Sequence, residues 1–259
     1  MTFATLPALF ISHGSPMMAV DAGEVADAMH RLSTNLPRPN AIVVVSAHWE
    51  SDALEVSTAS RPETWHDFNG FPEELYQIRY PAPGSPALAE RIIHMLIDAG
   101  LDAHGNSLRP RDHGVWAPLL HLYPEADIPV IHISIPRSFR PQQLFELGHA
   151  LSSLRTQQIL LIGSGSITHN LRELSFRDTY AAPPNWASSF KSWVIQKLGN
   201  SDYTAVLNWK YEAPNAKQNH PTDEHLEPLF FTMGAGSRFS VVHSSFTMGS
   251  LGMDIYRFD

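Results

Sequence analysis

Four short, nearly continuous apolar runs stand out along the chain. They cover residues 6–12, 41–47, 128–135 and 158–164, are rich in β-branched side chains, and are bounded by proline or polar residues. Apolar runs of this length, without polar alternation, are typical of strands buried on both faces of a parallel sheet. The pattern therefore predicts four inner strands of a largely parallel sheet.

Segments with helical periodicity separate these runs and follow the last of them. The periodicity predicts helices over residues 22–36, 86–99, 115–122, 141–155, 186–198 and 224–233. Alternation of strand and helix predicts an α/β fold with right-handed crossovers, in which helices cover both faces of the sheet. We therefore expect three layers around a mostly parallel central sheet.

Two further regions complete the pattern. Residues 241–246 and 253–258 alternate between apolar and polar positions, which predicts a C-terminal hairpin of edge strands. Residues 61–86 are dense in proline, glycine and aromatic side chains, and long loops of this kind inside a domain are usually functional or disordered. The many aromatic residues argue against disorder. No linker interrupts the pattern, so we predict a single domain over residues 1–259.

Composition narrows the chemistry. The 259 residues include no cysteine, which leaves nitrogen and oxygen as the plausible metal ligands. The formal charge of −8 and the absence of a basic block exclude a nucleic-acid partner or an anionic membrane surface. No leader pattern precedes the first strand and no apolar run approaches the length of a membrane span, so we expect a cytoplasmic protein. A monomer or a small homo-oligomer is expected.

Histidines follow three of the predicted strands. His13, His48 and His169 each lie where an apolar run ends. In open α/β sheets, ligands bind in the crevice beyond the carboxyl ends of the strands, so three imidazoles would reach one rim. Convergence of imidazoles from distant parts of the chain predicts a metal site.

Two more histidines precede predicted helices. His113 comes before the helix at residues 115–122, and His225 comes near the start of the last helix. Thr222 or Asp223 is expected to cap that last helix and to hold His225 near its first turn. Among the other histidines, the sequence leaves His66 undecided. Helical, surface or core patterns indicate structural roles for His30, His94, His104, His121, His132, His149 and His243.

A series of short motifs, spread in order over nearly the whole chain, resembles one known family. The motifs are His13-Gly14-Ser15-Pro16, Ser46-Ala47-His48-Trp49, His66-Asp67-Phe68, Gly70-Phe71-Pro72, Tyr80-Pro81-Ala82-Pro83-Gly84, Asp112-His113-Gly114, Tyr123-Pro124-Glu125-Ala126-Asp127-Ile128-Pro129 and Thr168-His169-Asn170-Leu171. Together they are similar to the 4,5-DOPA extradiol dioxygenase family, which belongs to the class III extradiol ring-cleavage dioxygenases. The resemblance covers enough blocks to be specific for the family.

The resemblance implies a single-domain α/β fold with one mononuclear non-haem metal, active as Fe(II) and sometimes found as Zn(II). It implies that His13, His48 and His225 are metal ligands, that His169 is either a ligand or the acid–base group, and that His113 is a second pocket histidine. The substrate would be a small catechol, DOPA-like, cleaved with dioxygen. Which catechol is used and which ring bond is cut do not carry over.

The expected ligand set departs from the usual pattern of non-haem Fe(II) oxygenases. That pattern has two histidines and one carboxylate, whereas here His225 takes the third place with Glu224 beside it. His169, or else His113, would accept the catechol proton, and His169 is preferred because it leaves a strand at the same rim.

Two other functions fit the same histidines. A zinc-dependent hydrolase is the main alternative, because three imidazoles also hold catalytic zinc. A metal-chelating or tetrapyrrole-handling protein is a third reading. Oxygen uptake with a catechol separates the dioxygenase from both.

Overall fold

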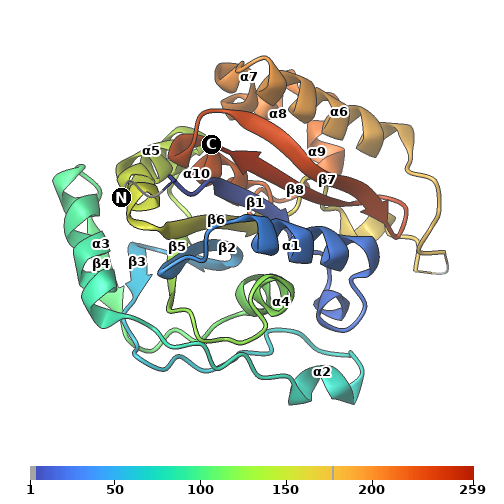
Figure 1. Ribbon diagram of the computed structural model, residues 1–259. Helices are drawn as coiled ribbons and strands as arrows, with labels where there is room; N and C mark the ends of the chain where they lie inside the picture. Colours follow the sequence, from blue (N-terminus) through green and yellow to red (C-terminus); the bar gives the residue numbers. More distant parts are fainter. Residues whose placement is uncertain (1–3, 177) are drawn as a thin grey trace.

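A mixed sheet runs through the protein, as the computed structural model shows for residues 4–176 and 178–259 (Figure 1). Within these residues, eight strands are hydrogen-bonded in the order β4-β3-β5-β2-β6-β1-β8-β7. Their bounds are β1 (Ala8–Ser12), β2 (Ala41–Ser51), β3 (Leu54–Ser57), β4 (Ala103–Asn106), β5 (Val130–Pro136), β6 (Ile159–Gly165), β7 (Phe239–Thr247) and β8 (Leu251–Phe258).

The centre of the sheet is parallel. β5, β2, β6 and β1 are parallel neighbours, β8 joins β1 in the antiparallel sense, and β7 pairs with β8 as a hairpin. The prediction of a mostly parallel sheet with a C-terminal hairpin is therefore confirmed. The sequence pattern missed β3 and β4, which have four residues each and are too short for a periodicity to stand out.

Six of the helices correspond to the predicted ones. The helices are α1 (Gly23–Asn35), α2 (Glu73–Gln77), α3 (Pro86–Asp98), α4 (His113–Leu122), α5 (Pro141–Leu151), α6 (Asn185–Gly199), α7 (Tyr203–Leu207), α8 (Trp209–Glu212), α9 (Ala216–Asn219) and α10 (Glu227–Ala235), with short 3₁₀ helices η1 (Pro16–Ala19), η2 (Ser152–Gln157) and η3 (Leu171–Glu173). The helix predicted at residues 141–155 divides into α5 and η2. Within the described ranges, no helix has the length and apolar character that a bilayer crossing requires.

The sheet separates two hydrophobic cores. Along β2, Val43 and Val45 face one core, and Ile42 and Val44 face the other, because successive strand residues point to opposite faces. α3, α5, α6 and α10 contribute to the first core, and α1 and α4 to the second (Figure 1). The expected three-layer α/β architecture is confirmed.

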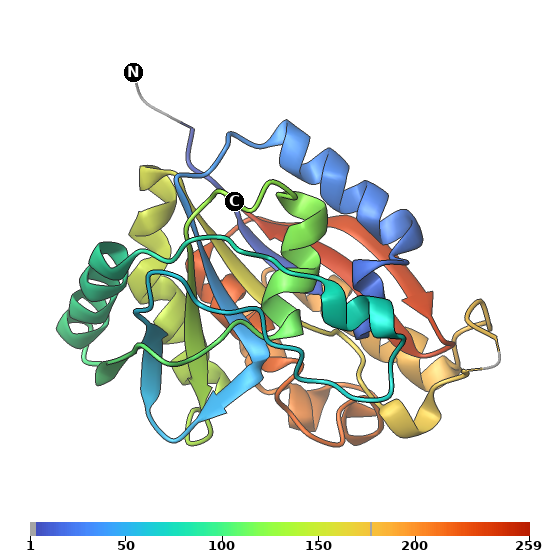
Figure 2. The same cartoon turned by 90° about the horizontal axis from the view of Figure 1, so that it is seen from below.

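The aromatic loop, residues 61–86, is held down by polar contacts. The buried guanidinium of Arg111 donates to the carbonyl of Pro83 at 2.9 Å, and the indole N–H of Trp116 in α4 donates to the carbonyl of Trp65 at 2.9 Å. Figure 2 shows this part of the chain, with the short α2, crossing next to α4. The loop thus forms a fixed cover on the α4 side of the sheet.

The contact between α5 and α10 predicts a strong response to one added methyl group. A Cβ on Gly148 would lie 1.9 Å from the carbonyl oxygen of Phe231 in α10. Gly148→Ala should therefore lower the free energy of unfolding by at least about 1–3 kcal/mol, measured by urea denaturation. Gly199→Ala is the matched control, because a Cβ at Gly199 in α6 meets no atom within 4 Å. Equal stability of the two variants would contradict this account of the helix contact.

Candidate metal centre

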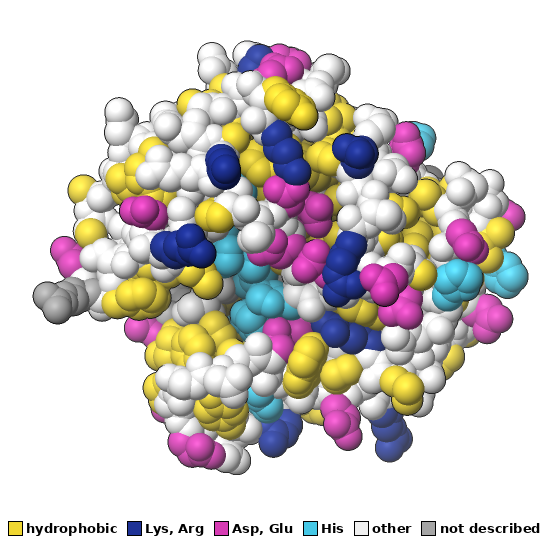
Figure 3. Space-filling model, turned by 180° about the vertical axis from the view of Figure 1, so that it is seen from behind, with side chains coloured by type: hydrophobic (Ala, Val, Ile, Leu, Met, Phe, Trp, Pro, Cys, Tyr) yellow, Lys and Arg dark blue, Asp and Glu magenta, His cyan; other side chains and the backbone are white. Residues whose placement is uncertain are grey.

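Five histidines converge beyond the carboxyl ends of the inner strands. His13 follows β1 directly, His48 lies near the end of β2, and His169 comes four residues after β6. His113 is the first residue of α4, and His225 precedes α10. In Figure 3, histidine side chains gather in a hollow near the centre of one face, with acidic and basic side chains around them.

Local backbone features direct two of these side chains. The pairing of β2 with β5 shifts register between Val45 and Glu50, and such irregularities re-aim side chains next to active sites. His48 lies inside this stretch. After β1, Gly14 has φ +61°, a left-handed backbone conformation that side-chain-bearing residues rarely adopt. Glycine is therefore needed for the turn that directly follows His13.

The expected capping of the last helix is wrong. α10 begins at Glu227, and the residue before it makes no side-chain cap, so neither Thr222 nor Asp223 caps the helix. His225 lies in the turn that precedes the helix. Its carbonyl accepts a hydrogen bond from the backbone N–H of Ser166, at 2.7 Å, just after β6. The link to the neighbouring strand end, rather than a helix cap, positions this histidine.

The spacing of three imidazole rings fits a shared ion. The ring centres of His13 and His48 are 4.8 Å apart, those of His48 and His225 are 5.1 Å apart, and those of His13 and His225 are 5.3 Å apart. Imidazole nitrogens bind such an ion at about 2.0–2.1 Å. If the nitrogen–metal–nitrogen angles lie between a right angle and the tetrahedral angle, the ring centres of two bound imidazoles are about 4.5–5.3 Å apart. The three rings therefore match the spacing of a tris-imidazole site.

The hydrogen bonds of His13 reveal its tautomer. Its Nδ1 lies 3.0 Å from the hydroxyl of Ser164, and that hydroxyl donates its one proton to the carbonyl of Gly114 at 2.5 Å. Ser164 must therefore accept from His13, which places the ring proton on Nδ1. The lone pair of Nε2 is left facing Nε2 of His48, 2.9 Å away.

Carboxylates face the Nδ1 atoms of the other two rings. The Nδ1 of His48 lies 3.3 Å from Asp67, and the Nδ1 of His225 lies 2.9 Å from Glu224. Ionised carboxylates only accept hydrogen bonds, so both rings are favoured with the proton on Nδ1 and a bare Nε2. Metal-bound histidines commonly donate their second nitrogen to such partners.

Electrostatics keep these rings neutral. Burial, followed by the neighbouring imidazoles, lowers the pKa of His13 and His225 well below its usual value, and burial also lowers the pKa of His48. Neutral imidazoles are the form that binds metal ions. Bare nitrogens that face each other across a short gap are stabilised by a cation, so this donor set fits one divalent ion.

His169 is oriented differently. Its ring lies on that of His225, with centres 3.4 Å apart and planes within 8° of parallel. The nitrogen lone pairs of two stacked rings lie in parallel planes and do not converge on one point. Burial lowers the pKa of His169 to about 4, so this ring is neutral at pH 7.

Two groups of three residues each have ligand atoms close enough together to hold a metal ion, and between them they include all five histidines. The ligand atoms of His13, His48 and His113 lie within 4.8 Å of one another. Those of His169, Glu224 and His225 do so as well, with Glu224 engaged with Nδ1 of His225. The five predicted site histidines are thus one contiguous group.

Asp67 connects the aromatic loop to the centre. One of its oxygens accepts hydrogen bonds from the backbone N–H and Nδ1 of His113, both at 2.9 Å. Burial alone would raise the pKa of Asp67, but the hydrogen bond from His113 and the two nearby imidazoles lower it to about 2.

Sequence reasoning assigned no role to Asp67 or Ser164. The motif His66-Asp67-Phe68 was the available signal for Asp67, whereas Ser164 lies unmarked within a buried strand.

His66 and His132 lie beside the centre and not in it. The ring of His66 contacts Phe68 and Trp116 in the aromatic cover. His132 is buried in β5, and its Nε2 lies 3.6 Å from Oδ2 of Asp112. Burial lowers the pKa of His132 to about 3. The core role expected for His132 agrees with this position.

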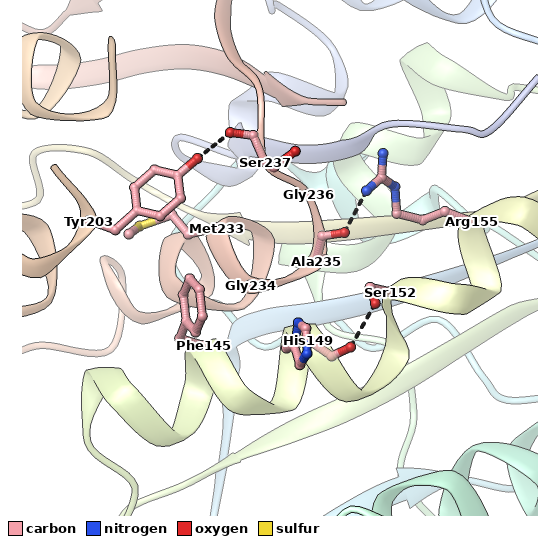
Figure 4. Close-up of a pocket in the computed structure, with 10 residues that line it drawn as sticks. All are labelled: Phe145, His149, Ser152, Arg155, Tyr203, Met233, Gly234, Ala235, Gly236 and Ser237. Carbon is pink, nitrogen blue, oxygen red and sulfur yellow. Dashed lines mark hydrogen bonds between the residues drawn. The ribbon is translucent and has the colours of Figure 1, made fainter. Parts of the chain in front are cut away.

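A separate pocket of about 270 Å³ is lined by residues of α5, η2 and α7 and by the end of α10 (Figure 4). Arg155 lines it and donates to the carbonyls of Leu6 and Ala235, and Leu6 and Arg155 precede β1 and β6 in the chain. Among its described lining residues, His149 is the one imidazole and none is a carboxylate. This pocket therefore offers no set of metal ligands.

Comparisons with known proteins agree on one family. The model for the catalytic LigB subunit of aromatic ring-opening dioxygenase matches residues 7–259. A "4,5-DOPA dioxygenase extradiol" of Beta vulgaris is 40% identical, with 96% of this chain and 95% of that protein covered. One of the same name from Escherichia coli (strain K12) is 38% identical, with 98% and 94% covered. The crystal structure of an uncharacterized Escherichia coli K12 protein superposes with a TM-score of 0.82 at 34% identity, covering 98% of this chain and 100% of that one.

Proposed function

Because this chain belongs to the LigB family of aromatic ring-opening dioxygenases, we propose that it cleaves a catechol with dioxygen at one divalent metal bound by His13, His48 and His225. Membership makes the protein an extradiol ring-cleaving dioxygenase, as its named relatives are. The observation that carries the metal assignment is the mutual spacing of the three rings, 4.8, 5.1 and 5.3 Å between centres.

Fe(II) held by these imidazoles would supply a Lewis acid with an accessible redox couple and open positions for both the catechol and dioxygen. The chain contributes neutral nitrogen donors, and Ser164, Asp67 and Glu224 lie beside their Nδ1 atoms. We propose Fe(II) as the active metal. Zinc is expected in the protein as isolated, because nitrogen sites bind Zn²⁺ more tightly than Fe²⁺.

His169 is the proposed acid–base group. Its stacked orientation on His225 argues against a place among converging ligands. No hydrogen bond from the described chain engages its ring, and burial keeps it neutral with a pKa of about 4. A neutral imidazole beside the centre can accept the proton of a catechol hydroxyl and return it later.

His113 is proposed as the second pocket histidine. Its ring centre is 4.2 Å from that of His48, and its Nδ1 donates to Asp67. The bare Nε2 is therefore free to accept a hydrogen bond from a substrate hydroxyl. The ring of Phe68 makes an edge-on contact with that of His113, with ring centres 5.7 Å apart, and is proposed as an aromatic wall of the substrate pocket.

The proposed substrate is a small, DOPA-like catechol. The names of the relatives and the aromatic side chains beside His113 support this class. The zinc-hydrolase and tetrapyrrole alternatives find no support among these relatives. The cytoplasmic location and the monomer or small homo-oligomer stay predictions from the sequence.

Metal replacement tests this function. Protein stripped with a chelator and reloaded anaerobically with Fe(II) should consume oxygen with a catechol and form a coloured ring-opened product. Protein reloaded with Zn(II) should not, because zinc has no accessible redox couple. A panel that includes DOPA and protocatechuate, followed with an oxygen electrode, measures both. Equal ring cleavage with the two metals would contradict the proposal.

A further inference from the structure

One carboxylate from the aromatic loop contacts two imidazoles of the centre. Oδ1 of Asp67 accepts from the backbone N–H and the Nδ1 of His113 at 2.9 Å, and Oδ2 lies 3.3 Å from the Nδ1 of His48. The side chain of Asp67 is only 7% exposed. Both histidines therefore place Nδ1 beside the same carboxylate, His113 in a hydrogen bond and His48 in a longer ion-pair contact.

An acceptor opposite Nδ1 decides where a neutral imidazole carries its proton. A carboxylate has no proton to give at neutral pH, so each ring is favoured with its proton on Nδ1 and its lone pair on Nε2. For His48 this matters, because its Nε2 lies 2.9 Å from the bare Nε2 of His13, a hydrogen-bond distance at which His13 competes with Asp67 for the proton of His48. A proton on Nε2 of His48 would occupy the position that a metal ion needs.

We propose that Asp67 is a positioning residue that sets the tautomer of both His48 and His113, so that the Nε2 lone pair of each faces the metal centre. This inference rests on the proposed metal site and deepens it. The first histidine is a proposed ligand and the second a proposed pocket group. A single residue of the aromatic loop would thereby prepare both the metal and the substrate side of the site.

A purely structural role makes a different prediction. Asp67 accepts from the first backbone N–H of α4, where a negative charge stabilises a helix. If that were its whole role, removing the charge would lower thermal stability and leave metal affinity unchanged. Metal affinity and tautomer therefore separate the two explanations.

Asp67→Asn is the informative variant, because it keeps the shape and replaces one acceptor oxygen with an N–H donor. If the amide oxygen still serves His113, the amide N–H meets Nδ1 of His48 and drives that ring's proton to Nε2. The zinc affinity should fall about 10–100-fold, as for loss of other partners of metal-bound histidines, measured by competition with a chromophoric chelator. Asp52→Asn, which removes a surface partner of Arg137, is the matched control and should bind zinc like the wild type.

Nitrogen NMR of isotope-labelled imidazoles gives the second readout. The wild type should show His48 and His113 with the proton on Nδ1, and Asp67→Asn should move the proton of His48 to Nε2. Zinc affinity within about twofold of the wild type, with unchanged tautomers, would overturn the inference. If the variant does not fold, the wild-type spectrum alone decides, because an Nε2 proton on His48 contradicts the assignment. If the wild type binds no zinc, the proposed metal centre is refuted. The imidazole spectrum of the wild type would still test whether Asp67 sets the tautomers of His48 and His113.

Discussion

Alanine at position 169 should lower the kcat for ring cleavage by about 10²–10⁴-fold and leave the bound metal in place. The reason is the geometry of the stacked pair: the centre of the His169 ring lies 3.4 Å from that of His225, in a nearly parallel plane, so the two rings do not direct their nitrogen lone pairs at one point. Its loss should remove proton transfer and spare the ligand set. Steady-state oxygen uptake and metal analysis of the same sample measure the two effects separately.

His121→Ala serves as the control for this variant. His121 lies in α4 and bonds the carbonyl of Met18, so its removal takes away an imidazole outside the five-histidine group. The control should keep its turnover. If His169→Ala loses metal together with activity, His169 is a ligand, and normal turnover would exclude it from the mechanism altogether.

The fold could be predicted in large part because it depends on local patterns. The apolar runs at residues 41–47 and 158–164 correspond to β2 and β6, and their two-faced burial follows directly from the missing polar alternation. Three histidines at strand ends could be placed on one rim for the same reason, since parallel neighbours end at the same edge of the sheet. The four-residue strands β3 and β4 were missed because so few residues show no period.

The orientation of the site residues could not be predicted, because it depends on contacts between distant residues. Asp67 meets His113, 46 positions later in the chain, and Ser164 meets His13 across 151 positions. Neither contact leaves a periodic signal. The cap expected for the last helix was a local inference, and it failed because a backbone hydrogen bond from Ser166 holds His225 instead.

The three proposed ligands have two kinds of partner opposite their Nδ1 atoms. His13 has a neutral hydroxyl opposite its Nδ1, whereas carboxylates face the Nδ1 of His48 and the Nδ1 of His225. A carboxylate makes an imidazole a stronger donor than a hydroxyl does. Two negative partners also offset part of the charge of a divalent ion, which an all-imidazole set would otherwise leave uncompensated.

His13→Ala should abolish stable metal binding and, with it, ring cleavage. His13 is 1% exposed, which makes it the least exposed of the three proposed ligands, and its Nε2 lies 2.9 Å from that of His48. Removing it leaves two of three proposed donors, and the affinity should fall by more than the roughly 10–100-fold expected when only a partner of a ligand is lost. Zinc competition and oxygen uptake after Fe(II) reloading measure both consequences.

Ser164→Ala provides the graded comparison for His13→Ala. It removes the hydroxyl opposite Nδ1 and keeps the ring, so its loss of zinc affinity should be at most about 10–100-fold and clearly smaller than that of His13→Ala. Thermal melts of both metal-free variants control for damage to the fold. A larger loss of zinc affinity in His13→Ala than in Ser164→Ala is expected only if Nε2 of His13 binds the ion directly. Equal affinities of His13→Ala and the wild type would remove His13 from the ligand set and leave the ring spacing without a metal to explain it.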